Sequence, residues 1–234
     1  MFRACLYAEN PAPGVLPPAL RAWLGLTSVL GTLVVAVLGV LYAGHGEPGR
    51  VDRWFVDPTA DSVRPPWRNV ALATDFLGEP AGAAALVVAA VTVCLLLRWP
   101  RAAVLVVAGA GLTVGTATLI KQVVGRTIHG AGNLSYPSGH AAFVTALALV
   151  VALLATGRLG LGRSAGTSLV LAAALVFGAA MGWAQVALGA HYPTDVLGGW
   201  CTALAVVPAT AWLVDRTADR LADRTADADR RERR

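Results

Sequence analysis

The sequence predicts an all-α protein in which six helices cross a membrane as a bundle. The 234 residues are 56% hydrophobic and only 14% charged, which is too apolar for an ordinary soluble domain of this size. Six apolar segments approach the roughly 20 residues that a helix needs to cross a hydrocarbon core. One soluble core could not bury so many segments of this length. The chain is therefore expected to be a multi-pass membrane protein.

The six expected spans are separated by short loops, with one long exception. The fourth span is the shortest, and Gly139 and His140 can extend it outward. The long stretch 45–79 is expected to lie along the membrane surface with an amphipathic turn or two near residues 70–77, and an irregular loop is the alternative. The spans are residues 22–44, 80–97, 102–120, 141–156, 166–188 and 194–214.

Arginines at the loops predict the orientation of the bundle. Short loops rich in Lys and Arg face the cytoplasm. Segment 1–21 and tail 215–234, which holds seven arginines, are therefore expected to be cytoplasmic, and the first, third and fifth loops to face out of the cell. The tail is expected to be a charged helix or a disordered segment without catalytic residues. The flanking arginines of the second and fourth loops are Arg98, Arg101, Arg158 and Arg163.

The first loop also carries positive charge, but we give it less weight because it is long and acidic residues balance it. Four aspartates accompany the four arginines along it: Arg50, Asp52, Arg53, Asp57, Asp61, Arg64, Arg68 and Asp75.

Composition also excludes some classes of protein. The net charge is +5, but the basic residues lie at segment ends and are not interleaved with aromatic residues as on a nucleic-acid surface. No nucleic-acid partner is therefore expected. Cys5, Cys94 and Cys201 lack paired spacing, which excludes a disulfide or metal framework. No cofactor is expected. The N-terminus has no continuous apolar signal-peptide core, so the first span should remain in the mature protein.

The unusual residues gather in the third and fifth loops. Lys121 is the only lysine beside eighteen arginines, which suggests that a compact ammonium group is wanted at that position. Alternatively, its side chain simply snorkels from the end of the third span.

A Tyr-Pro-Ser-Gly-His run opens the fourth span. Ser138 can cap the helix, and Gly139 lets its backbone N–H approach a ligand closely. Free N–H groups at a helix N-terminus bind anions. His140 at this position favours chemistry over an ordinary loop-to-helix transition.

A His-Tyr-Pro-Thr-Asp run opens the sixth span. The spacing places the Asp195 carboxylate within reach of the His191 ring, where it can fix the tautomer and leave the other nitrogen free as a nucleophile or base. Alternatively, Asp195 only favours the helix N-terminus and His191 is a polar interface residue.

Together these residues match phosphoryl transfer without a metal. A cation and N–H donors hold the phosphate oxygens, one histidine attacks phosphorus and another protonates the leaving oxygen. Three of the four histidines, His129, His140 and His191, are expected on this outward face.

These motifs resemble the type 2 phosphatidic acid phosphatase superfamily, which includes vanadium-dependent haloperoxidases. Its pattern is Lys-x6-Arg-Pro, then Pro-Ser-Gly-His, then Ser-Arg-x5-His-x3-Asp. The resemblance implies that His191 forms a phosphohistidine, Asp195 orients it and His140 protonates the leaving group. It also implies that Lys121, Ser138 and Gly139 hold the phosphate.

Two positions depart from this pattern, because Ile128 and Gln185 stand where the family has phosphate-binding arginines. Losing one donor to a developing oxyanion costs about 3 kcal/mol, or roughly a hundredfold in rate. Arg126, His129 and Gln185 are the candidates for replacing these donors.

The sequence therefore favours a metal-independent membrane lipid phosphatase acting on a phosphatidate-like or polyprenyl phosphate or pyrophosphate. The alternative is a catalytically weak or inactive relative that binds phosphorylated lipids or partner proteins. A haloperoxidase or a transporter explains the motifs less economically. No sequence feature fixes the oligomeric state.

Overall fold

The computed structural model describes residues 14–59, 63–130 and 132–233. Its regular secondary structure there is helical, apart from one isolated bridge between Thr127 and Leu134. Cys5, Asp61 and most of segment 1–21 lie outside the described residues. The elements are the 3-10 turn η1 (Pro18–Leu20) and the helices α1 (Arg21–Leu41), α2 (Arg50–Thr59), α3 (Trp67–Phe76), α4 (Pro80–Leu96), α5 (Pro100–Val124), α6 (Gly139–Arg158), α7 (Arg163–Ala187) and α8 (Pro193–Glu232).

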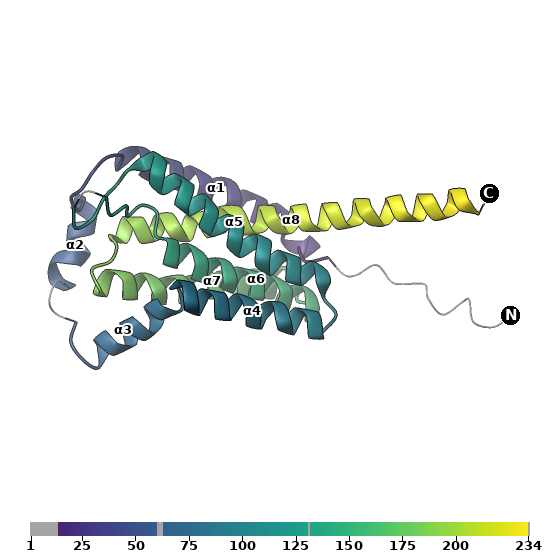
Figure 1. Cartoon of the computed structure of the whole chain (residues 1–234), viewed down its shortest axis with the longest axis horizontal. Helices are drawn as coiled ribbons and strands as arrows, with labels where there is room; N and C mark the ends of the chain where they lie inside the picture. Colours follow the sequence, from purple (N-terminus) through teal and green to yellow (C-terminus); the bar gives the residue numbers. More distant parts are fainter. Residues whose placement is uncertain (1–13, 60–62, 131, 234) are drawn as a thin grey trace.

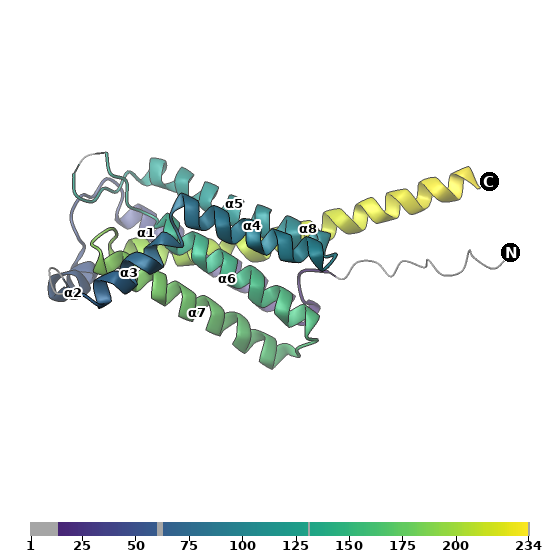
Figure 2. The same cartoon turned by 60° about the horizontal axis from the view of Figure 1, so that its bottom comes forward.

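Helix α8 organises the bundle. It packs against α1, α5 and α6, while α6 also contacts α5 and α7, and α4 lies against α5. Figures 1 and 2 show these long helices running side by side, with α2 and α3 set across one end. The core between them is made of aliphatic side chains, among them Leu24, Leu105, Leu149, Leu153 and Val207.

The length and apolarity of the helices confirm the membrane-spanning fold. Five helices are long and apolar enough to cross a membrane, and the pair α3 and α4, bent by 60°, gives a sixth. The outward faces remain apolar, as on α1, where Leu26, Val29 and Leu33 are each more than half exposed. Such faces suit contact with lipid chains.

Two expectations about the polar segments change. Stretch 45–79 is mostly helical, so the irregular-loop alternative is wrong, and α2 within it was not foreseen. The last helix does not end at residue 214 but continues to Glu232, as the charged-helix alternative proposed. Both segments are too polar to stand out as membrane spans, so hydropathy alone could not delimit their helices.

The two ends of the bundle differ in character. One end, called here the α2/α3 end, carries α2, α3 and the loops that follow α5 and α7 (Figure 1). The opposite end carries the arginine-flanked turns and the projecting part of α8. There Asp215 accepts the backbone N–H groups of Val15 and Leu16, and Arg101 pairs with Asp219 at 2.8 Å. The arginine-flanked second and fourth loops and the charged tail thus share one end of the bundle, while the orientation in the membrane stays a prediction.

Gly199 permits a close approach between α6 and α8. A Cβ atom built there would lie 2.3 Å from the Ser138 carbonyl oxygen and 3.1 Å from the Ala142 nitrogen. Small residues commonly let membrane helices approach in this way. The absence of a side chain at this position therefore fixes how the start of α6 meets α8.

Two cysteines, Cys94 and Cys201, are buried free thiols.

Replacing Gly199 by alanine is expected to lower stability, because backbone atoms of α6 must shift to accept the methyl group. We expect a loss of about 1–3 kcal/mol, seen as a lower midpoint of thermal unfolding in detergent. The matched control is Gly111→Ala in α5, where a new Cβ meets nothing within 4 Å. A Gly199→Ala midpoint equal to that of Gly111→Ala would contradict this packing.

Candidate active site

The N-terminus of α6 presents the Ser-Gly-His run at the α2/α3 end. Ser138 is the N-cap, and its hydroxyl accepts a hydrogen bond from the Ala141 N–H at 3.3 Å. Its own backbone N–H donates to the Asp195 carbonyl at 2.9 Å. This bond ties the second motif directly to the third, so α6 and α8 begin beside each other.

His191 and Asp195 face each other at the start of α8. The Nδ1 atom of His191 lies 3.7 Å from Asp195 Oδ2, which is longer than a hydrogen bond, and the imidazole is 9% exposed. Asp195 Oδ2 also accepts the Tyr192 N–H at 3.0 Å. The pairing is therefore electrostatic here, and small movements of the ring can shorten it.

Burial lowers the pKa of His191 below its ordinary value, and the neighbouring Asp195 carboxylate opposes this shift. The positive charges of Lys121 and His140 lower the pKa further. A lowered pKa keeps the imidazole neutral near pH 7, which is the form that can act as a nucleophile or base.

Lys121 lies near the end of α5 and holds the loop before α6. Its ammonium donates to the carbonyls of Leu134 and Ser135 at 3.0 and 3.3 Å. An ammonium has three donors, so one remains for a ligand. The residue is half-buried and its charge acts on both His191 and Asp195.

Arg126 is fully buried behind Asp195. Its Nη1 donates to Asp195 Oδ1 at 2.7 Å and to Thr194 Oγ1 at 2.6 Å, and its Nη2 donates to Asp52 Oδ2 at 2.6 Å. Both terminal nitrogens are thus engaged by protein groups. This geometry favours a role through Asp195 over the direct phosphate contact that the sequence suggested.

Gln185 is also engaged by a neighbour. It is 1% exposed and its amide Nε2 donates to Asp75 Oδ1. The same Asp75 oxygen lies 3.6 Å from His140 Nε2, and a Glu79 oxygen lies 3.9 Å from it. Gly78 packs on the ring, because a Cβ built there would lie 2.3 Å from His140 Cδ2. The α3–α4 turn therefore covers His140 and brings two carboxylates to it.

Asp75, Glu79 and His140 also form a group that could hold a divalent cation. Their ligand atoms all lie within 4.8 Å of one another. Carboxylate and imidazole groups suit several metals. Asp75 and Glu79 also have a second explanation, because their carboxylates lie beside the polar ring of His140.

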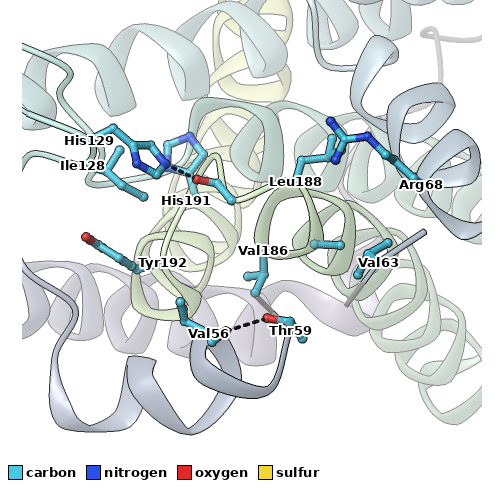
Figure 3. Close-up of a pocket in the computed structure, with 12 residues that line it drawn as sticks. Val56, Thr59, Val63, Arg68, Ile128, His129, Val186, Leu188, His191 and Tyr192 are labelled. Atoms are coloured by element: carbon cyan, nitrogen blue, oxygen red, sulfur yellow. Dashed lines mark hydrogen bonds between the residues drawn. The ribbon is translucent and has the colours of Figure 1, made fainter. Parts of the chain in front are cut away.

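An open cavity of about 300 Å³ reaches His191 from the α2/α3 end. Figure 3 shows His129, Arg68 and Tyr192 around it, with the His129 Nε2–H bonded to the Gly189 carbonyl at 2.7 Å. Ile128 lines it too. The residues lining it are Val56, Thr59, Val63, Arg68, Ile128, His129, Val186, Ala187, Leu188, Gly189, His191 and Tyr192.

The structure gathers every residue singled out from the sequence at this end and adds others, among them Asp52, Asp75 and Arg68. Asp52 and Asp75 looked like counter-charges of the loop arginines, and Arg68 like one of those arginines. No local pattern distinguishes them from Asp57 or Arg64, because only the packing of α2 and α3 against the bundle brings them to the site.

The fold and site define a class of protein: a multi-pass helical membrane protein with a Ser-Gly-His helix start beside a His–Asp pair. The chain belongs to the PAP2 superfamily, whose family model matches residues 78–219. The match includes the residues from Lys121 to Asp195 and leaves out all of α2 and α3.

A solved structure shows the same fold. The crystal structure of the first transmembrane PAP2-type phosphatidylglycerolphosphate phosphatase from Bacillus subtilis superposes with a TM-score of 0.64. The two sequences are 20% identical, and the likeness covers 83% of this chain and 96% of that one. No curated relative matches this sequence.

Proposed function

We propose that this protein is a lipid phosphatase that removes a phosphate from a lipid phosphomonoester or pyrophosphate through a phosphohistidine. The observation that carries the proposal is the bond between Ser138 N–H and the Asp195 carbonyl. It joins the N-terminus of α6 to the first turn of α8 next to His191, which supports a shared phosphate site there. Membership of the PAP2 superfamily and the similarity to a lipid phosphatase support it.

The proposed reaction has two steps. The free ring nitrogen of His191 attacks phosphorus, the bond from phosphorus to the lipid oxygen breaks, and His140 gives its proton to that oxygen. Water then attacks the phosphohistidine, His140 takes a proton from the water, and the bond from phosphorus to nitrogen breaks. Lys121, Ser138 and the Gly139 N–H hold the phosphate oxygens, and Asp195 orients His191.

The location of the site suits a lipid substrate. It lies at the ends of apolar helices, where a headgroup can enter while the acyl or prenyl chains stay in the bilayer. The arginine distribution supports cytoplasmic termini in a cell membrane and a site that faces outward. Phosphatidate-like and polyprenyl substrates both fit this placement.

The proposal is tested with purified protein in detergent and a panel of lipid phosphates, with a chelator present. We expect phosphate release, and a loss of about a thousandfold or more in His191→Ala. No release from any substrate, or full activity in His191→Ala, would overturn the proposal. Activity that disappears with the chelator and returns with a divalent cation would contradict the metal-independent mechanism and point to Asp75, Glu79 and His140.

Arg68 is proposed to supply positive charge to the phosphate that the family takes from its motif arginines. It lines the same cavity as His191 and Ile128 (Figure 3). Arg68→Ala is therefore expected to raise KM about tenfold, as loss of a charged hydrogen bond of about 1.5 kcal/mol would do. The control is Arg64→Ala, four residues earlier and before α3 begins, which is exposed and not among the lining residues. Equal KM values for both variants would exclude this role.

A second candidate function is a weak or inactive relative that binds phosphorylated lipids. One observation favours it. The family pattern has an arginine at position 185, whereas here Gln185 binds Asp75, whose negative charge lies near His140.

Gln185→Arg distinguishes the two functions. If the native site is competent, the new guanidinium pairs with Asp75 and the rate of phosphate release changes little. If the site lacks a needed donor, the rate rises by roughly a hundredfold. Lipid-phosphate binding that survives His191→Ala, with no turnover in the wild type, would also favour the binding protein.

A further inference from the structure

Asp52 is a buried carboxylate on an otherwise exposed surface helix. It is 0% exposed, while the other residues of α2 are half-buried or exposed. Its two oxygens accept four donors: the Gly49 N–H, the Thr194 N–H, the Thr194 hydroxyl and Arg126 Nη2. A buried carboxylate is costly unless it is paired in this way, so the position of α2 depends on these contacts.

Arg126 connects Asp52 to the candidate site. Its guanidinium lies between the rings of Tyr42 and Tyr192, at 4.1 and 4.6 Å from their centres, and bonds Asp52 on one side and Asp195 on the other. Cation–π contacts and paired charges fix such a group firmly. The Asp195 oxygen that it holds is Oδ1, which leaves Oδ2 for the Tyr192 N–H and His191.

These residues form a continuous chain of charges from the surface helix to His191. Asp52 and Asp195 are negative and Arg126 is positive, so the chain carries a net charge of −1 next to the imidazole. Of this chain, Asp195 acts on His191 directly, as do Lys121 from α5 and His140 from α6, so Asp52 and Arg126 reach His191 through Asp195.

We propose that Asp52 and Arg126 are positioning residues that act on His191 through Asp195, and that α2 is thereby part of the working site. The inference rests on the proposed function, in which His191 is the nucleophile. The family arginine that binds phosphate corresponds to Ile128, and Arg126 lies two residues before it. In this proposal Arg126 binds the Asp195 carboxylate and not the phosphate. Asp52 lies outside the stretch that the family model matches.

Asp52 has a specific electrostatic effect in this arrangement. Without its charge, Arg126 cancels Asp195 and the net charge of the chain rises from −1 to 0. The protonated form of His191 is then stabilised less, so its pKa falls. Since the nucleophile must be unprotonated, the acidic limb of the pH–rate profile moves to lower pH.

The test compares Asp52→Asn with Asp57→Asn, which removes the same charge from an exposed position of α2. We expect Asp52→Asn to lower kcat by about tenfold or more, with little change in KM, and to move the acidic limb to lower pH. Asp57→Asn should match the wild type. An Asp52→Asn profile that superimposes on the wild type would overturn the proposal.

A double variant separates this effect from a general loss of structure. Asp52→Asn with Arg126→Gln again leaves a net charge of −1 beside His191, so its acidic limb should return towards that of the wild type, while kcat stays low. Loss of packing alone would not restore the limb. A limb that stays at the Asp52→Asn position would contradict the charge chain.

A measurement without turnover keeps this inference distinct from the proposed function. Diethyl pyrocarbonate modifies neutral imidazole, and mass spectrometry of the peptide that contains His191 follows its modification against pH. The midpoint should fall in Asp52→Asn and not in Asp57→Asn, even if no lipid phosphate is hydrolysed. Identical midpoints in the three proteins would overturn the inference, whereas absence of phosphate release would count only against the proposed function.

Discussion

The arrangement of the site depends on the buried carboxylate of Asp195. One of its oxygens is held by Arg126, the other by the Tyr192 N–H beside His191, and its backbone carbonyl accepts the Ser138 N–H. A single residue thus fixes the start of α8, the neighbour of the proposed nucleophile and the entry to α6. Gly199 lets α6 and α8 pack closely at the same junction. Hydrogen bonding and helix packing therefore stabilise the same arrangement of the two helix starts.

The departures from the family pattern become intelligible in this geometry. Ile128 lines the cavity beside His191, and Gln185 is bonded to Asp75, so neither position is simply vacant. Positive charge near the site comes instead from Lys121, from the buried Arg126 and from Arg68 on α3. In this molecule the surface helices α2 and α3 contribute charged groups that the family motifs do not include. Of these, Arg68 of α3 is the one proposed to replace a missing arginine, while Asp52 of α2 pairs with Arg126.

The comparisons establish the family and the fold, whereas the contacts within the chain support the roles of single residues. The family match covers residues 78–219 and the structural likeness extends over most of the chain, which together establish the family and the membrane fold. The roles proposed for single residues rest on contacts within this chain, because 20% identity carries no information about side chains that differ. Asp52, Arg68 and Asp75 are the residues for which this distinction matters most.

The sequence by itself determined the all-α membrane fold, the approximate spans and the two histidine motifs, because apolar length and short-range spacing are local properties. His191 and Asp195 are four residues apart across the N-terminal cap of α8, so their proximity follows from local geometry. Only the tertiary structure decided that Asp52 contacts Arg126 and Thr194, and that Asp75 contacts Gln185. These partners are 74, 142 and 110 residues apart in the chain. Charged residues on polar surface helices carry no period that reveals a buried partner, and packing of α2 and α3 onto the bundle selects which of them are drawn inside.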